Sequence, residues 1–265
     1  MGPAGATTLE LSSSDRLNVM PLFHIHSLMA ILSSLTAGGS VVFGSNPDLS
    51  DSFECMEEFR PSWYTASPTI HQFILGQAAW NQNIVARCLL RFIRSASSAF
   101  PPKVMAKLES VFRAPVIESY AMTEASHQIS SNPLPPGKRK VGSVGVAAGP
   151  EVGIMDDSGN LLPHDNTGEI AIRGANVMEG YENNPTANKE AFTNGWLRTG
   201  DQGHLDTDGY LFVTGRLKEI INRGGEKVSP REVDEVIMEH PAVAQVATFA
   251  IPHPVLGEDV ECLLL

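Results

Sequence analysis

The sequence predicts an α/β fold: a mixed or parallel sheet with helices, then a small β-barrel-like unit, then the start of a small α+β domain. Three observations support this order. Up to about residue 140, apolar runs alternate with helical patterns, which is typical of a sheet covered by helices. Over 141–216 the runs are short and separated by Asp/Asn and Gly turn signals, which favour antiparallel strands. Over 217–265 a strand, a Gly-Gly loop and a well-signalled helix follow.

The first part, residues 1–140, is expected to be a partial α/β subdomain. Its apolar runs are predicted as strands buried on both faces of a sheet, and they are LNVMPLF, SVVF, SWYTASP, LLRFIRSAS and PVIESY. The segments PTIHQFILGQAA and PPKVMAKLESVF have helical periodicity. The stretch LMAILSSLTAGGSVVFG is interrupted by Ser-Ser and Gly-Gly-Ser, so a helix followed by a short strand is expected rather than a membrane span. The opening MGPAGATT is low in apolar residues and is expected to be frayed.

The second and third parts, 141–216 and 217–265, are expected to be an antiparallel β subdomain and an incomplete C-terminal domain. The turn signals DDSGN, DNTG and DTDG divide the second part into short runs. In the third part Ser229 is a predicted helix N-cap, Pro230 the first helical residue and Glu232 the partner in a capping box. The sequence halts on the apolar run VECLLL, which favours a chain that has been cut.

Composition excludes several classes of partner. The 265 residues carry a formal net charge of -11, whereas a nucleic-acid backbone or an anionic membrane would require a basic surface. An anionic ligand must therefore be bound by a few local cations, backbone N–H groups or a metal ion. The three cysteines, Cys55, Cys88 and Cys262, are far apart and make neither a disulfide framework nor a C-x-x-C metal pair. With no signal peptide, an intracellular, reducing compartment is expected.

The segment ESYAMTEASHQISSNP contains the first candidate site. Thr123 and Glu124 come directly after a predicted strand. A Thr hydroxyl can donate to a phosphate oxygen and an adjacent carboxylate can hold Mg²⁺. Taken alone, the pair is common, and a loop that caps a helix or turn is the favoured interpretation. In the same way Asp201 could accept hydrogen bonds from a ribose diol and Arg216 could donate to that sugar or to phosphate, or both could belong to a solvated β-turn.

Two further segments have functional and structural interpretations. The small residues of SASSA, which include Ser97 and Ala99, would let the backbone approach a flat ligand closely, as any tight turn would. His24 and His26, if extended, would point to one face as two zinc ligands or as a polar pocket wall, and the pocket wall is preferred because no Cys or carboxylate stands at metal spacing. No P-loop pattern and no G-x-S-x-G elbow is present.

The order of these motifs resembles that of the acyl-adenylate-forming enzymes, which include acyl-CoA synthetases, coumarate-CoA ligases and luciferases. The resemblance rests on PLFHIHSL, SASSA, YAMTEASHQISSNPLPPGKRKVGSVG, GEIAIRG and GWLRTGDQGHLDTDGYLFVTGRLKEIINRGGEKVSPREVD, in that order. Within this family, YAMTEASHQISSNPLPPGKRK and INRGGEKVSP are most similar to the oxalate-CoA ligases of fungi and plants. The resemblance implies a partial adenylate-forming fold, and a cytoplasmic or peroxisomal location.

The resemblance also implies roles for individual residues. It suggests that Tyr120 stacks on adenine, that the Thr123 hydroxyl binds phosphate and that the Glu124 carboxylate holds Mg²⁺. It also suggests that Asp201 binds the ribose together with Arg216, and that Lys218 is a hinge between domains. Gly225 and Lys227 would lie in a loop beside the pantetheine of CoA. Ser97 and Ala99 would border the adenine. The implied cofactors and substrates are ATP, Mg²⁺, CoA and a small carboxylic acid.

The implied reaction has two steps, in which a carboxylate attacks the α-phosphate of ATP and the CoA thiol then attacks the acyl-adenylate. Positioning and cationic donors supply the catalysis. His26, His127 and Ser97, with His24 in the same wall, offer donors suited to the second carboxylate of a short diacid, although either of His26 and His127 could equally be hydrogen-bonded packing. The resemblance, rather than these donors, puts oxalate before a coumarate-like or medium-chain acid.

Two segments of the family pattern are not found in this chain: the Ser/Thr/Gly-rich phosphate loop that precedes PLFHIHSL, and the later GK segment. Weak activity or none is therefore expected of the 265 residues alone. The alternative is a non-catalytic module that binds a nucleotide or a partner.

Overall fold

The structure is a computed structural model that describes residues 2–19, 24–44, 49–243 and 245–265. The chain forms two compact units, which are described separately. The first contains Met1–Glu151 and Arg173–Tyr181, and the second contains Val152–Ile172 and Glu182–Leu265. Part of the predicted strand LNVMPLF, from residue 20 on, lies outside the described residues.

The first unit is built on a seven-stranded mixed sheet with strand order β2-β1-β3-β4-β5-β6-β7. The strands are β1 (Arg16–Val19), β2 (Ser40–Phe43), β3 (Trp63–Ala66), β4 (Phe92–Ser95), β5 (Val116–Tyr120), β6 (Ser130–Ser131) and β7 (Val146–Ala147). Neighbours among β1 to β5 pair in parallel, whereas β6 and β7 are antiparallel. The α/β sheet expected from the alternating pattern is therefore confirmed.

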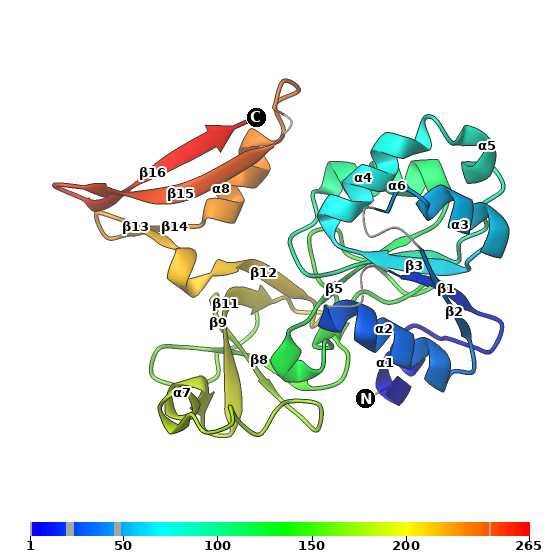
Figure 1. The fold of residues 1–265 in the computed structure, drawn as a ribbon. Coiled ribbons are helices and arrows are strands. Elements are labelled where there is room, and N and C mark those ends of the chain that lie inside the picture. Colours follow the sequence, from blue (N-terminus) through cyan, green and yellow to red (C-terminus); the bar gives the residue numbers. More distant parts are fainter. Residues whose placement is uncertain (1, 20–23, 45–48, 244) are drawn as a thin grey trace. The chain divides into compact units, whose positions relative to one another are not determined.

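Consecutive strand residues enter two different cores, because successive side chains point to opposite faces of a sheet. Tyr64 and Ile93 pack in a cluster with three helices, whereas Trp63 and Phe92 pack in a cluster on the other face. The first face is covered by α3 (Ser52–Phe59), α4 (Pro68–Ala78) and α6 (Pro102–Phe112), with the short α5 (Gln82–Val85) nearby, and the second by α1 (Gly2–Thr8) and α2 (Ile25–Thr36) (Figure 1). The strands are thus buried on both sides, as their apolar runs predict.

The start of the chain differs from the expectation of a frayed end. Residues Gly2–Thr8 form α1, which packs against α2. A Cβ placed on Gly5 would lie 2.3 Å from the Ser33 Oγ, so the absence of a side chain at Gly5 permits the close approach of the two helices. Tertiary packing of this kind overrides a weak local propensity.

The second unit begins with a curled five-stranded sheet of order β10-β11-β9-β8, with β12 paired to β11. Its elements are β8 (Glu151–Met155), β9 (Gly168–Arg173), α7 (Pro185–Ala191), β10 (Phe192–Thr193), β11 (Trp196–Leu205) and β12 (Leu211–Arg216). The predicted turn DTDG connects β11 to β12, where the Asp206 Oδ1 accepts from the backbone N–H groups of Asp208 and Tyr210 at 3.0 and 2.9 Å. The antiparallel strands expected in this region are therefore confirmed.

A four-stranded sheet and one helix complete the second unit, with strand order β14-β13-β16-β15. The elements are a 3₁₀ turn (Leu217–Glu219), β13 (Ile221–Arg223), β14 (Glu226–Val228), α8 (Pro230–Ile237), β15 (Val246–His253) and β16 (Gly257–Leu264). Ser229 caps α8 as predicted, because its side chain accepts from the Glu232 N–H. None of the helices in the described ranges is both long enough and apolar enough to span a membrane.

Candidate active site

The predicted phosphate and metal residues lie in a tight loop at the end of β5, residues 122–128, which we call the site loop. Tyr120 ends β5, and Thr123 and Glu124 lie in a 3₁₀ turn. Ser126 and His127 follow with φ of 55° and 56°, a left-handed conformation that is uncommon outside glycine and is found often at functional sites. The His127 N–H donates to the Met122 carbonyl at 2.9 Å, which closes the loop on itself.

A distant stretch of sequence braces the site loop. The Asn176 Nδ2 donates to the carbonyls of Ala125 and Gln128 at 2.9 and 2.8 Å. In return, the Ser126 Oγ donates to the Asn176 carbonyl at 3.0 Å. Residues 173–181, which we call the bracing segment, therefore fix the backbone that carries Thr123 and Glu124.

The three histidines predicted to form a polar wall come together beside the site loop. The His26 and His127 rings stack with centroids 4.6 Å apart, and the His24 ring lies 6.4 and 6.3 Å from them. The extended arrangement considered for His24 and His26 is wrong, because α2 begins at Ile25 and the His24 Nδ1 caps it by accepting from the His26 N–H. Among the described residues no group of three His, Cys, Asp or Glu side chains could hold a metal ion, so the zinc alternative gains no support.

His26 is fully buried and its hydrogen bonds define its protonation. Its Nε2 lies 3.1 Å from the Arg94 Nη1 and 2.5 Å from the Thr65 Oγ1. Because a guanidinium can only donate, the Nε2 must accept, and the proton therefore resides on Nδ1. That Nδ1 lies 3.2 Å from the Ser97 Oγ. Ser97 itself has φ of 85°, so the SASSA turn is held in a conformation that costs strain.

Arg94 is the functional candidate that the sequence reasoning missed. It is 9% exposed, and no carboxylate in the described ranges forms an ion pair with it. Burial lowers the pKa of Arg94 to about 10, so it remains cationic at neutral pH. A signal was present: an arginine in the middle of a run predicted to be buried on both faces is exceptional unless it has a partner.

The charge of Arg94 acts on the neighbouring rings. Burial, and next the positive charge of Arg94, lower the pKa of both His26 and His127 well below 6.5. Both rings are therefore neutral. Neither ring nitrogen of His127 has a hydrogen-bond partner among the residues that the structure describes, although the residue is only 4% exposed, and buried polar groups left without partners are rare and require an explanation.

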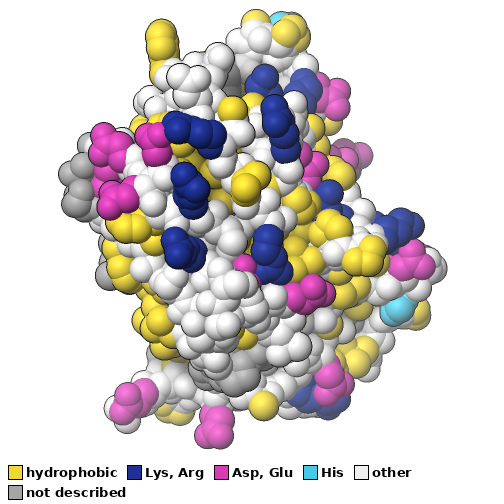
Figure 2. All heavy atoms as spheres, turned by 90° about the vertical axis from the view of Figure 1, so that its right-hand side faces the viewer, with side chains coloured by type: hydrophobic (Ala, Val, Ile, Leu, Met, Phe, Trp, Pro, Cys, Tyr) yellow, Lys and Arg dark blue, Asp and Glu magenta, His cyan; other side chains and the backbone are white. Residues whose placement is uncertain are grey.

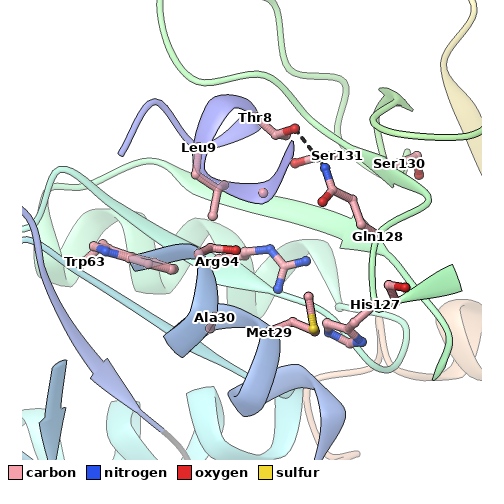
Figure 3. Close-up of a pocket in the computed structure, with 13 residues that line it drawn as sticks. Thr8, Leu9, Met29, Ala30, Trp63, Arg94, His127, Gln128, Ser130 and Ser131 are labelled. Carbon is pink, nitrogen blue, oxygen red and sulfur yellow. Dashed lines mark hydrogen bonds between the residues drawn. The ribbon is translucent and has the colours of Figure 1, made fainter. Parts of the chain in front are cut away.

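A cavity of about 40 Å³ adjoins these groups. Arg94 and His127 line it together with Trp63, Met29 and Ala30, and Figure 3 shows the Arg94 guanidinium and the His127 ring directed toward the same space. On the other side Gln128 donates to the Thr8 hydroxyl at 2.9 Å. The cavity thus combines one buried cation, the neutral ring of His127, and walls of both apolar and hydroxyl or amide side chains.

The second unit carries the residues predicted to bind the ribose. Asp201 on β11 and Arg216 on β12 are direct partners in the strand register, and the Arg216 Nε lies 2.8 Å from the Asp201 Oδ1. Asp201 is buried, whereas Arg216 is about half exposed. Within β11, at the irregularity in its pairing with β9, the Glu169 Oε1 accepts from the Gly200 N–H at 2.9 Å. The Asp201 carboxylate and the Arg216 guanidinium therefore form one ordered ion pair.

The remaining predicted residues are exposed. Lys218 lies in the 3₁₀ turn after β12. Gly225 and Lys227 lie in the β13–β14 hairpin, where the Asn222 Oδ1 accepts from the Gly225 N–H at 3.1 Å. Ala99 is exposed in the loop that follows β4. The structure therefore brings the three histidines and Ser97 together in the first unit, and it pairs Asp201 with Arg216 in the second. The four other residues lie in turns, loops or the β13–β14 hairpin: Ala99, Lys218, Gly225 and Lys227.

Comparison with known proteins shows the family to which the chain belongs. The family model described as AMP-binding enzyme matches residues 4–182. An oxalate–CoA ligase of Arabidopsis thaliana is 48% identical over 261 residues, covering 97% of this chain and 51% of that protein. An oxalate–CoA ligase of Saccharomyces cerevisiae is 46% identical over 266 residues, covering 98% and 48%.

Solved structures show the same relationship. ATP-bound MatB from Rhodopseudomonas palustris superposes with a TM-score of 0.91 at 28% identity, over 99% of this chain and 52% of that chain. The o-succinylbenzoate coenzyme A synthetase of Bacillus subtilis, in complex with ATP and magnesium ion, gives 0.86 at 31% identity, over 99% and 54%. The chain thus spans about half the length of the relatives that it matches, and it belongs to the AMP-binding enzyme family.

Proposed function

We propose that this chain is part of an AMP-forming acid–thiol ligase that activates a short dicarboxylic acid, oxalate in the first place. The observation that carries the proposal is the buried Arg94, which has no carboxylate partner among the described side chains and lines a small cavity with His127. A buried cation without an anion is costly. A carboxylate of the substrate would supply that anion.

The neighbours of Arg94 favour a small, doubly charged acid over the alternatives. His26 and His127 are neutral rings, and His127 has unused donor and acceptor atoms. These groups, with the Ser97 hydroxyl, suit carboxylate oxygens. A coumarate-like or medium-chain acid would leave Arg94 facing apolar atoms, which would cost the desolvation of the charge with no gain.

The proposed reaction uses the residues in two steps. One substrate carboxylate attacks the α-phosphorus of ATP, pyrophosphate leaves, and an acyl-adenylate forms. The CoA thiol then attacks the acyl carbon and AMP leaves. In this proposal Tyr120 stacks on adenine, the Thr123 hydroxyl donates to phosphate, and Asp201 with Arg216 binds the ribose. Arg94 and the histidines hold the second carboxylate, which fixes the orientation of the first.

Glu124 is the residue proposed to hold Mg²⁺. Its side chain is partly exposed beside Thr123, and within the described ranges no cation forms an ion pair with it. One carboxylate with nucleotide phosphates and water is a usual set of ligands for Mg²⁺. The ion would neutralise phosphate charge during the displacement.

The second unit would contribute to the thioester step. We propose that the chain turns at Lys218 and that Gly225 and Lys227 then border the pantetheine of CoA. In the absence of a phosphate loop and of the later GK segment, we propose that the 265 residues alone have weak activity. A nucleotide-binding or partner-binding fragment without catalysis remains the rival function.

Replacement of the buried cation tests the proposed substrate. In the full-length protein, Arg94→Met should lower kcat/KM for oxalate by about 100-fold, since loss of one partner of a buried charge pair costs about 2–5 kcal/mol. AMP release should be measured with oxalate, a coumarate-like acid and a medium-chain acid. Arg91→Met is the control, because Arg91 pairs with Asp15 outside the cavity. An equal loss for all acids, or oxalate activity unchanged in Arg94→Met, would contradict the dicarboxylate proposal.

A further inference from the structure

Tyr181, at the end of the bracing segment, makes a hydrogen bond to the proposed metal carboxylate. Its Oη donates to the Glu124 Oε1 at 3.0 Å. The two residues are far apart in sequence yet both belong to the first unit. Tyr181 is 39% exposed, so its ring is not a core residue whose hydroxyl happens to reach a polar neighbour.

Glu124 is held at its backbone as well as at its side chain. The Met178 N–H donates to the Glu124 carbonyl at 2.8 Å, and the Asn176 Nδ2 donates to the carbonyls of Ala125 and Gln128, which follow Glu124. A glutamate side chain has several rotatable bonds, and an exposed one samples many rotamers. The contact with Tyr181 removes that freedom at the carboxylate, where the backbone contacts alone could not.

We propose that Tyr181 is a positioning residue that aims the Glu124 carboxylate at Mg²⁺ bound with the nucleotide phosphates. The Tyr181 hydroxyl engages Oε1, which leaves Oε2 to face the ion. Carboxylates that bind metal ions are themselves hydrogen-bonded in proteins, and removal of such a partner typically lowers metal affinity about 10- to 100-fold. This inference rests on the proposed function, because it needs a nucleotide and Mg²⁺ at the site loop.

The test separates metal binding from nucleotide binding without measuring turnover. Calorimetric titrations of the chain with AMP in EDTA, and with ATP in EDTA or in excess Mg²⁺, should be made for wild type, Tyr181→Phe and Tyr210→Phe. The last variant also removes a single tyrosine hydroxyl, but in the second unit. We expect the metal-free AMP affinity to be the same in all three proteins. The gain in ATP affinity on adding Mg²⁺ should fall about 10-fold in Tyr181→Phe only.

Each other outcome has a distinct meaning. A full Mg²⁺ gain in Tyr181→Phe would overturn the positioning role, as would an equal weakening of metal-free AMP binding, which would indicate a general structural role. A wild-type chain that binds AMP but gains nothing from Mg²⁺ would overturn the proposed metal role of Glu124, and this inference with it. A folded wild-type chain that binds neither nucleotide would instead refute the nucleotide site of the proposed function.

Discussion

Three histidines of the first unit, His26, His71 and His127, are buried as neutral rings. Burial is the main cause that lowers the pKa of each, to about 4 for His71 and to about 2 for His127. In the unfolded chain they would titrate near 6.5. Between these values the unfolded state binds more protons than the folded state, so stability is complete above about pH 6.5 and is lost as the pH falls.

His127→Gln should weaken this acid sensitivity, because the variant removes one group that takes up a proton on unfolding. We expect its free energy of unfolding to fall less than that of the wild type between pH 6.5 and pH 5, by roughly 1–2 kcal/mol. Urea unfolding at several pH values measures the difference. His164→Gln, at an exposed position of the second unit, is the matched control. Equal slopes for His127→Gln and wild type would show that the His127 ring is accessible to protons in the folded chain.

The residues of this site differ in how far sequence could predict them. The site loop follows a clear strand, and the histidines and Ser97 lie in recognisable motifs, so they could be named. Arg94 could not be given a role, because its meaning depends on which carboxylates lie near it in space. The local sequence around Arg94 does not show which carboxylates lie near it in the folded chain.

Among the elements, α8 is the one whose boundaries sequence predicts best, and its cap has a measurable role. The Ser229 side chain accepts from the Glu232 N–H, and its Oγ donates to the Thr214 carbonyl on β12 at 2.6 Å. The cap therefore starts the helix and also ties it to the neighbouring strand. Loss of an N-cap serine typically costs about 1 kcal/mol.

Ser229→Ala should therefore loosen α8 selectively. Hydrogen exchange of the amides in Pro230–Ile237 should speed up about five-fold, the factor that corresponds to about 1 kcal/mol. Ser158→Ala, at an exposed turn of the same unit, is the matched control and should leave these amides unchanged. No acceleration in Ser229→Ala would mean that packing, not the cap, holds the first turn.

The bracing segment is the element that sequence could not place. After Arg173, the last residue of β9, it has no regular secondary structure, and its hydrogen bonds to the site loop join residues about 50 positions apart. Strands and capped helices can be predicted because their residues repeat with a local period. A loop that is hydrogen-bonded to another loop has no such repeat in its sequence. The alternating first part and the turn-rich second part were predictable because each repeats a local pattern several times.

At the scale of the whole molecule, net charge describes the chain only coarsely. The formal charge is -11, yet Figure 2 shows a face on which Lys and Arg side chains gather among apolar patches. Arg94 is the extreme case, a single cation enclosed in a neutral environment. Anions can therefore be bound locally by an acidic protein, as the composition already required.

AMP binding by the 265-residue chain is the broadest test of the proposed function, because single variants test the adenine role of Tyr120 and the ribose role of Asp201 separately. Asp201→Ala in the second unit should weaken AMP about 10- to 100-fold, since hydrogen bonds to a charged group are worth about 1.5–3 kcal/mol. Tyr120→Ala in the first unit should weaken it to a similar extent through lost stacking, worth about 1–3 kcal/mol per base. Calorimetry measures both, with Asp206→Asn, which alters a turn carboxylate, as the control.

These two variants distinguish the candidate functions. If both weaken AMP binding, the adenine role of Tyr120 and the ribose role of Asp201 are both supported. If only Tyr120→Ala does so, the ribose role of Asp201 is wrong. If a folded chain binds no AMP, the nucleotide site of the proposed function is refuted for these 265 residues, and the non-catalytic partner-binding function becomes the better account of them.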